Sequence, residues 1–116
     1  MKPVIGVTCW PEEVKRWYFV PVDYVHAVEK VGGLPVILPF AEGENQAAEL
    51  LARVDGLLLT GGVDVDPKYW GEEPLPKMGK IQPEQDISDL ALARVAMSRD
   101  MPVLGICRGH QVVAVA

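Results

Sequence analysis

A cysteine between two glycines is the feature of this sequence with the clearest chemical potential. Residues 103–107 are apolar and predict a short buried strand, and residues 108–116 predict the start of a helix. Gly105 and Gly109 stand two residues before and after Cys107, which gives G-x-C-x-G, the cysteine counterpart of a nucleophile elbow. Glycines let strand, strained turn and helix approach closely. The turn would place the thiol at a helix N-terminus, where free N–H groups favour a thiolate.

A second interpretation treats Cys107 as a small apolar residue at the end of a buried strand. Free cysteine is commonly buried and then behaves as a hydrophobic residue. The motif by itself favours neither interpretation.

Two further glycines follow another apolar segment. Leu57-Leu58-Leu59-Thr60 leads directly into Gly61-Gly62. Glycines at this point let backbone N–H groups turn toward a bound oxygen without a side chain in the way. Together with the N–H of Arg108, the residue after the cysteine, they could form an oxyanion hole. The alternative is an ordinary turn between a strand and a helix.

Asp64 and Asp66 lie beside Pro67 and could be mistaken for a metal-binding pair. No histidine or further carboxylate follows at ligand spacing, so Asx-turn hydrogen bonding is the better interpretation. We expect neither a metal nor a cofactor.

Apolar segments alternate with amphipathic ones along the chain. The predicted strands are 3–8, 34–38, 56–60 and 103–107, the predicted helices are 21–31, 45–53, 83–99 and 108–116, and residues 12–19 predict a loop that could hold one helical turn. Apolar strands that alternate with helices indicate an α/β fold with a parallel sheet covered on both faces.

The helices are expected to face the sheet with small and branched apolar residues, and Asn45 is the predicted N-cap of the second helix. The inward faces are Val22, Val25, Val28 and Val31 in the first helix, Ala48, Leu51 and Ala52 in the second, and Ile87, Leu90, Ala91 and Val95 in the third.

Ligands of parallel sheets collect at the carboxyl ends of the strands. Three segments with chemical potential are expected at those ends: Thr8-Cys9-Trp10, Thr60-Gly61-Gly62 and Cys107-Arg108-Gly109. This convergence favours the nucleophile interpretation of Cys107. The long segment 63–82 is expected to border the same site.

Composition excludes several classes of partner. The 116 residues carry a net charge of −5, which argues against nucleic acid or an anionic membrane as partner. No apolar run approaches the ~18 residues that span a bilayer, and the N-terminus does not read as a signal peptide. The two cysteines are far apart in sequence, so we expect a reduced, cytoplasmic protein without a disulfide.

The combination of motifs resembles the class I glutamine amidotransferases. The resemblance is carried by Gly-Ile-Cys-Arg-Gly-His-Gln at 105–111 and by Leu-Leu-Leu-Thr-Gly-Gly-Val-Asp-Val-Asp-Pro at 57–67. Tyr69-Trp-Gly-Glu-Glu-Pro74 and Pro83-Glu-Gln-Asp86 are similar to the gamma-glutamyl-gamma-aminobutyrate hydrolase branch. The resemblance runs across essentially the whole chain and implies a flavodoxin-like parallel sheet.

The resemblance also implies a role for each matching residue. Cys107 would be the nucleophile, and the backbone N–H groups of Gly62 and Arg108 would bind the oxyanion. Gly61 would shape the hole, and Gln111 would lie beside the nucleophile at the substrate. The implied reaction is attack on a gamma-glutamyl amide, release of the amine, and hydrolysis of a glutamyl thioester.

One expected part of the catalytic machinery is missing from the motifs. The resemblance implies a Cys-His-Glu triad whose histidine and glutamate lie downstream of the elbow, and the chain ends at Ala116. His26 falls in the first predicted helix and His110 in the elbow helix, and neither matches the triad histidine. The last residues carry no helix-ending signal. We therefore expect residues 1–116 to be the N-terminal half of a single domain.

Two functions remain open on the sequence. The first is a hydrolase of small gamma-glutamyl amides, represented here by its nucleophile-bearing part. The second is a non-catalytic domain that binds a small metabolite or a partner chain at the same strand ends. A flavodoxin-like nucleotide binder is disfavoured because no G-x-G-x-x-G or phosphate-binding loop follows the first strand. An open sheet edge would also make the chain prone to self-association as a homo-oligomer.

Overall fold

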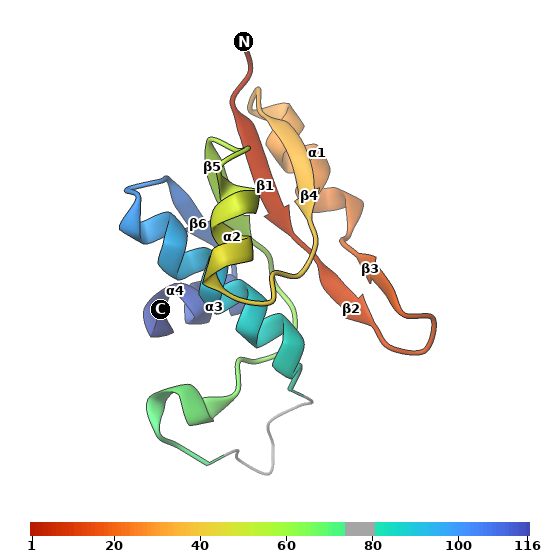
Figure 1. The fold of residues 1–116 in the computed structure, drawn as a ribbon. Helices are drawn as coiled ribbons and strands as arrows, with labels where there is room; N and C mark the ends of the chain where they lie inside the picture. Colours follow the sequence, from red (N-terminus) through yellow and green to blue (C-terminus); the bar gives the residue numbers. More distant parts are fainter. Residues whose placement is uncertain (74–80) are drawn as a thin grey trace.

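A four-stranded parallel sheet organises the chain. The structure is a computed structural model and describes residues 1–73 and 81–116. The strands are β1 (Val4–Thr8), β4 (Leu34–Leu38), β5 (Gly56–Leu59) and β6 (Val103–Gly105), in the spatial order β4-β1-β5-β6. Each neighbouring pair is parallel, so the carboxyl ends of the strands meet at one edge of the sheet (Figure 1).

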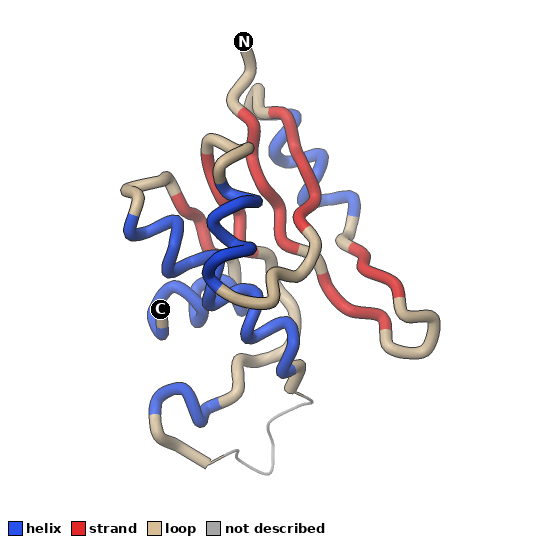
Figure 2. Tube along the Cα trace, in the orientation of Figure 1, coloured by secondary structure: helices blue, strands red, loops and turns tan. Residues whose placement is uncertain are grey.

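Helices lie on both faces of this sheet, which confirms the predicted fold class. α1 (Val22–Lys30) packs on one face, and α2 (Glu44–Leu51), α3 (Pro83–Ser98) and α4 (Arg108–Val115) pack on the other (Figure 2). A short 3₁₀ helix, η1 (Pro67–Trp70), follows the loop after β5. No helix among the described residues is both long and apolar enough to cross a membrane.

The central strand β5 lies between β1 and β6 and is buried on both faces, because helices cover the sheet on either side. Leu57 and Leu59 point into the larger core cluster beneath α2, α3 and α4. Leu58 points the opposite way and packs with Val7 and Val28 in the smaller cluster beneath α1. Burying each leucine stabilises the fold by about 2 kcal/mol, so β5 anchors the loop that follows it.

The two edge strands are less covered than their apolar sequences predict. Leu34, Val36 and Ile37 of β4 are each at least 40% exposed, and Leu104 of β6 is 62% exposed. The error has a simple cause, because β4 and β6 are the edge strands of this sheet in the described chain and each has a neighbouring strand on one side only. Self-association through such an edge stays a prediction.

Residues 10–19 form a β-hairpin where a loop was predicted. β2 (Trp10–Glu12) pairs with β3 (Trp17–Phe19) in an antiparallel ribbon that projects from the body of the molecule (Figure 1). The Glu12 carboxylate accepts hydrogen bonds from the N–H groups of Val14 and Lys15 and shapes the turn. Each strand has only three residues and β2 contains a proline, so no alternating pattern was visible.

The helix faces were predicted only in part. In α1 Val28 is buried, whereas Val22 and Val31 are exposed. In α2 the buried residues are Ala47 and Leu51.

The predicted N-cap of α2 was wrong. The N-cap is Gly43, which makes no side-chain cap, and the helix includes Asn45.

In α3 Leu90 and Ala91 are buried as predicted, but Ile87 is 47% exposed. Four polar α3 residues are buried as well: Gln85, Asp86, Ser88 and Asp89.

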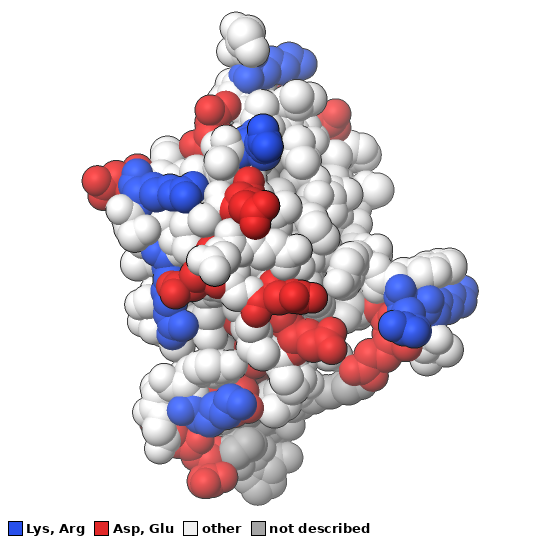
Figure 3. Space-filling model, in the orientation of Figure 1, with Lys and Arg blue, Asp and Glu red and all other residues white. Residues whose placement is uncertain are grey.

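Acidic and basic side chains are interspersed over the face of the molecule drawn in Figure 3. The sequence carries 16 acidic and 11 basic residues, so its excess charge is negative.

Candidate functional site

The three predicted strand ends lie together at the carboxyl edge of the sheet. The Thr8 and Thr60 hydroxyls are 3.0 Å apart, and the indole N–H of Trp10 donates to the Thr60 hydroxyl at 3.0 Å. A Cβ placed on Gly61 would lie 3.9 Å from the Cβ of Cys107. The predicted convergence is therefore confirmed, and the β5 loop faces the cysteine turn.

Cys107 occupies a strained turn between β6 and α4. Its backbone has φ 52° and ψ −109°, a conformation that costs on the order of 1–3 kcal/mol for a residue other than glycine. Hydrogen bonds hold both sides of the turn: the Ile106 N–H donates to the Leu59 carbonyl, and the His110 N–H donates to the Cys107 carbonyl. Cys107 is exposed, so its interpretation as a buried core residue is wrong.

The two flanking glycines are required by the packing of this turn. A Cβ on Gly105 would collide with the backbone of Gly109, and a Cβ on Gly109 would collide with the Leu59 carbonyl. Neither neighbour is a flexible side chain that could move away. The steric reason predicted for G-x-C-x-G is therefore confirmed.

The glycine loop after β5 lies against the first residue of α4. Gly62 has φ +137°, and a Cβ at this position would be 3.4 Å from the Cδ of Arg108. The Gly61 N–H donates to the Tyr24 hydroxyl at 3.1 Å, so this N–H already has an acceptor. Arg108 is the first residue of α4, where a backbone N–H has no partner within the helix. The arrangement can offer N–H groups to an oxygen near Cys107, and the oxyanion roles of Gly62 and Arg108 stay predictions.

The side chain of Arg108 is the centre of a buried ionic cluster that the sequence did not reveal. Its exposed fraction is 2%. Its guanidinium lies 2.8 Å from the Asp86 carboxylate and 3.3 Å from the Asp89 carboxylate, both on α3, and it donates to the Val63 carbonyl at 3.0 Å. The Asp86 contact is an ion pair by distance, although its angles lie outside hydrogen-bond geometry.

One guanidinium cannot neutralise two buried carboxylates. Burial raises the pKa of Asp89 from 3.8 to about 7, which the ion pair with Arg108 offsets only in part and the nearby Asp86 carboxylate reinforces. One oxygen of Asp89 is buried without a hydrogen-bond partner among the described residues. Asp89 is therefore the member of the cluster that is most readily protonated.

Gln111 lies on α4 one turn beyond Cys107. Its amide oxygen accepts from the Val65 N–H and its amide nitrogen donates to the Asp64 carboxylate, each at 3.1 Å. Both ends of the side chain therefore hold the loop after Gly62. Its predicted contact with substrate stays a prediction.

Of the Asp-x-Asp pair, Asp66 makes the hydrogen bond of a turn, whereas Asp64 accepts from the Gln111 amide. Asp66 is the N-cap of η1, and its carboxylate accepts from the Lys68 N–H at 2.9 Å. Within the described ranges, no cluster of three or more histidine, cysteine or acidic residues is arranged to hold a metal.

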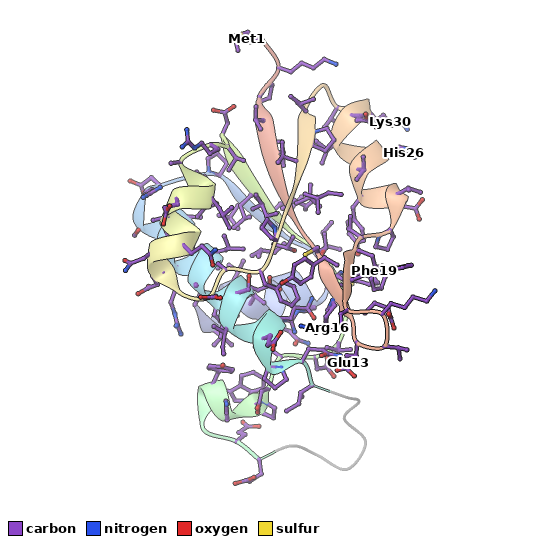
Figure 4. All side chains as sticks on the ribbon, turned by 45° about the vertical axis from the view of Figure 1, so that its right-hand side comes forward. Met1, Glu13, Arg16, Phe19, His26 and Lys30 are labelled. Carbon is purple, nitrogen blue, oxygen red and sulfur yellow. The ribbon has the colours of Figure 1, made fainter. Side chains whose placement is uncertain are left out.

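The two histidines lie on the surface. His26 is exposed on α1 near Lys30, on the outer flank of the molecule (Figure 4), and His110 is exposed on α4. Neither makes a side-chain hydrogen bond to the described residues. Of the segment 63–82, predicted to border the site, residues 74–80 lie outside the described chain, as does Pro74 of the similarity motif.

Sequence reasoning missed Tyr24, and it named Trp10 only as part of a strand end, without a role. Trp10 and Tyr24 pack edge to face, and their polar atoms bond Thr60 and Gly61. The only sequence signal for the ionic cluster was Asp86 and Asp89, three residues apart on an otherwise apolar helix face.

Comparison with known proteins places these features in a family. The Peptidase C26 family model matches residues 3–116. The chain is 38% identical over 122 residues to the putative glutamine amidotransferase Rv2859c of Mycobacterium tuberculosis, covering 99% of this chain and 40% of that protein. It is 38% identical over 120 residues to the putative glutamine amidotransferase-like protein YvdE of Lactococcus lactis, covering 97% and 50%.

A third relative carries a more specific name. The chain is 35% identical over 121 residues to the gamma-glutamyl-gamma-aminobutyrate hydrolase PuuD of Escherichia coli K12, covering 98% of this chain and 46% of that protein. The chain thus spans about half the length, or less, of these relatives. The match of the family model across 3–116, on a fold whose elbow and glycine loop meet, shows that this chain belongs to the peptidase C26 family.

Proposed function

We propose that this chain carries the nucleophile of an enzyme that hydrolyses gamma-glutamyl amide bonds through a cysteine thioester. The observation that carries the proposal is the exposed Cys107 in a strained turn that only glycines at 105 and 109 permit. A strained, exposed residue at the carboxyl edge of a parallel sheet is typical of a functional position.

The proposed reaction proceeds in two halves. The Cys107 thiolate attacks the gamma-carbonyl carbon, and the N–H groups of Gly62 and Arg108 stabilise the negative charge on the carbonyl oxygen. The tetrahedral intermediate collapses, the C–N bond breaks, and the amine leaves with a proton. Water then attacks the thioester, which releases glutamate and restores the thiol. The proton transfers need a base, and on the strength of the family resemblance we propose a histidine downstream of the elbow for that role.

The names of the relatives support amide hydrolysis in general, and they are the reason we propose small gamma-glutamyl compounds as the substrates. The name of the Escherichia coli relative specifies gamma-glutamyl-gamma-aminobutyrate as its substrate, and the other two are named as putative glutamine amidotransferases. We therefore propose gamma-glutamyl-gamma-aminobutyrate and glutamine as the first two substrates to test.

The deciding experiment measures glutamate release by the protein as it is encoded, with any residues that flank this chain. We expect release from at least one of the two substrates, loss of at least about 1,000-fold in Cys107→Ser, and near-normal release in the matched variant Cys9→Ser. A gamma-glutamyl adduct on Cys107, detected by peptide mass after acid quench, would show the thioester. Activity that survives Cys107→Ser would contradict the mechanism.

A second candidate is a binding domain without catalysis. The exposed positions of His26 and His110 favour it for the 116 residues taken alone, because neither is held at Cys107. Saturable binding of a gamma-glutamyl compound without glutamate release, in wild type and in Cys107→Ser alike, would favour this candidate over the hydrolase.

A further inference from the structure

The segment that follows Gly62 is fastened to α3 and α4 at four successive residues. We call residues 63–66 and the side chains that hold them the loop clamp. Its contacts are Arg108 Nη1 to the Val63 carbonyl at 3.0 Å, Gln111 Nε2 to the Asp64 carboxylate at 3.1 Å, the Val65 N–H to Gln111 Oε1 at 3.1 Å, and the Asp66 N–H to Asp86 Oδ2 at 3.0 Å. Every contact comes from α4 except the last, which comes from α3.

Asp86 is the α3 member of the loop clamp, and it contacts both Arg108 and the clamped loop. Its Oδ1 lies 2.8 Å from Nη2 of Arg108, and its Oδ2 accepts from the Asp66 N–H. Its side chain is fully buried. One carboxylate therefore connects the first residue of the elbow helix to the loop that begins at Gly62.

The two N–H groups proposed to bind the oxyanion belong to the two segments that Asp86 connects. Gly62 immediately precedes the clamped loop, and Arg108 immediately follows the nucleophile. The spacing of such donors must match the developing oxyanion rather than the ground-state carbonyl, so small shifts in their separation cost rate. The charge-assisted hydrogen bond from the Asp66 N–H and the ion pair with Arg108 are both buried, and together they can hold that spacing.

We propose that Asp86 is the positioning residue of this site, and that its carboxylate sets the separation between the Gly62 and Arg108 N–H groups. The inference rests on the proposed function. It assigns Asp86 no contact with substrate and no proton transfer.

The neighbouring Asp89 provides an internal comparison. It accepts from Nε of the same guanidinium at 3.3 Å, but the Asp66 N–H of the clamped loop donates to Asp86 and not to Asp89. An amide can replace a carboxyl that is already close to neutral. Asp89→Asn should therefore be tolerated where Asp86→Asn is not, although both changes remove one carboxylate from the same cluster.

The test measures hydrolysis of the better gamma-glutamyl substrate by the protein as it is encoded. For Asp86→Asn we expect kcat to fall about 100-fold with KM within about threefold, because transition-state contacts are lost and ground-state binding is kept. For Asp89→Asn we expect kcat within about threefold of wild type. Rates are expressed per chain whose buried Cys9 is protected from alkylation, so that loss of folded protein does not lower kcat.

A control away from the site tests whether any carboxylate bound to a backbone N–H would give the same result. Asp55 accepts from the Val4 N–H at 2.7 Å at the amino-terminal edge of the sheet. Asp55→Asn should leave kcat and KM unchanged within about twofold. An equal loss of kcat in Asp55→Asn and Asp86→Asn would overturn the positioning role.

A second variant keeps the test valid if Asp86→Asn does not fold. The triple change Asp86→Asn, Asp89→Asn and Arg108→Met removes all three buried charges and retains the backbone N–H at residue 108. It should fold and still show a loss of about 100-fold in kcat. Normal kcat in either Asp86 variant, with wild type active, overturns the role of Asp86 alone. Absence of hydrolysis by wild type overturns the proposed function itself.

Discussion

The two cysteines follow strands that end at the same edge of the sheet, yet one is buried and the other is exposed. Cys9 follows β1, is 1% exposed, and its thiol pKa is raised to about 11, first by burial and then by the Asp89 carboxylate. Cys107 follows β6, is exposed and has a positive φ. Position at the carboxyl edge therefore does not by itself make a cysteine reactive.

The difference between the two lies in the path of the chain after each strand. After Cys9 the chain continues into the β2–β3 hairpin, and the Cys9 carbonyl accepts from the buried Gln85 amide. After Cys107 the chain turns at once into a helix, and the glycines at 105 and 109 let that helix close against β5. The strained turn lifts Cys107 out of the core, and the ordinary exit from β1 leaves Cys9 inside it.

The largest expected effect is a difference in alkylation between the two thiols. At about pH 8 a thiol with a pKa near 11 is a thiolate in roughly one molecule per thousand, and Cys9 is also shielded from reagent. We expect iodoacetamide to modify Cys107 at least about 100-fold faster than Cys9, as measured by peptide mass over time. Equal rates in the folded chain would remove the contrast between the two sites.

The next effect comes from filling the space at the elbow. Gly109→Ala places a methyl group against the Leu59 carbonyl, and we expect it to lower the free energy of unfolding by about 3 kcal/mol and to slow Cys107 alkylation. Gly43→Ala is the matched control, because Gly43 has ordinary extended backbone and open space around its Cα. Its effect on urea unfolding should stay within about 0.5 kcal/mol. Similar losses in both variants would contradict the steric argument.

A smaller effect concerns how Asp89, the carboxyl group beside Cys9, makes the stability of the fold depend on pH. The pKa of Asp89 is about 7 in the folded state against 3.8 ordinarily, so between these values the folded chain holds a proton that the unfolded chain has released. The contribution of Asp89 to stability is therefore present at low pH and is lost as pH rises through about 7. Asp89→Asn cannot ionise.

Relative to wild type, Asp89→Asn should be more stable at about pH 8 than at about pH 5, by about 1 kcal/mol or more. Urea unfolding of both proteins at the two pH values measures this difference. If the difference in unfolding free energy between the two proteins is the same at both pH values, Asp89 does not titrate in this range.

The smallest expected effect tests the support behind the glycine loop. Tyr24→Phe removes the hydroxyl that accepts from the Gly61 N–H, at a cost of about 1 kcal/mol in unfolding free energy. Tyr18→Phe, on the exposed hairpin, should cost less than about 0.5 kcal/mol. We expect Cys107 alkylation in Tyr24→Phe to change by less than about threefold. A loss of the Cys107–Cys9 contrast in this variant would show that the hydroxyl, rather than the glycines, maintains the elbow.

Local patterns were sufficient to predict the four parallel strands, the four helices and the elbow, but not the β2–β3 hairpin. The four parallel strands and four helices follow from apolar segments that alternate with amphipathic ones, and G-x-C-x-G marks the turn through steric rules that need no distant residue. Burial was predicted less well. β4 and the ends of α1 are exposed because burial depends on how many elements lie alongside, which strand order decides.

The short-range sequence therefore determined that Cys107 would sit in a glycine-flanked turn, because only glycine fits positions 105 and 109 at any such turn. Tertiary structure decided which side chains support the turn. Asp86 and Asp89 meet Arg108 only because α3 packs beside α4, some 20 residues away in sequence but adjacent in space. The packing of the chain around the end of β1 likewise decided that Cys9 would be buried. Its thiol pKa is raised because the cost of forming a thiolate depends on the atoms that surround it.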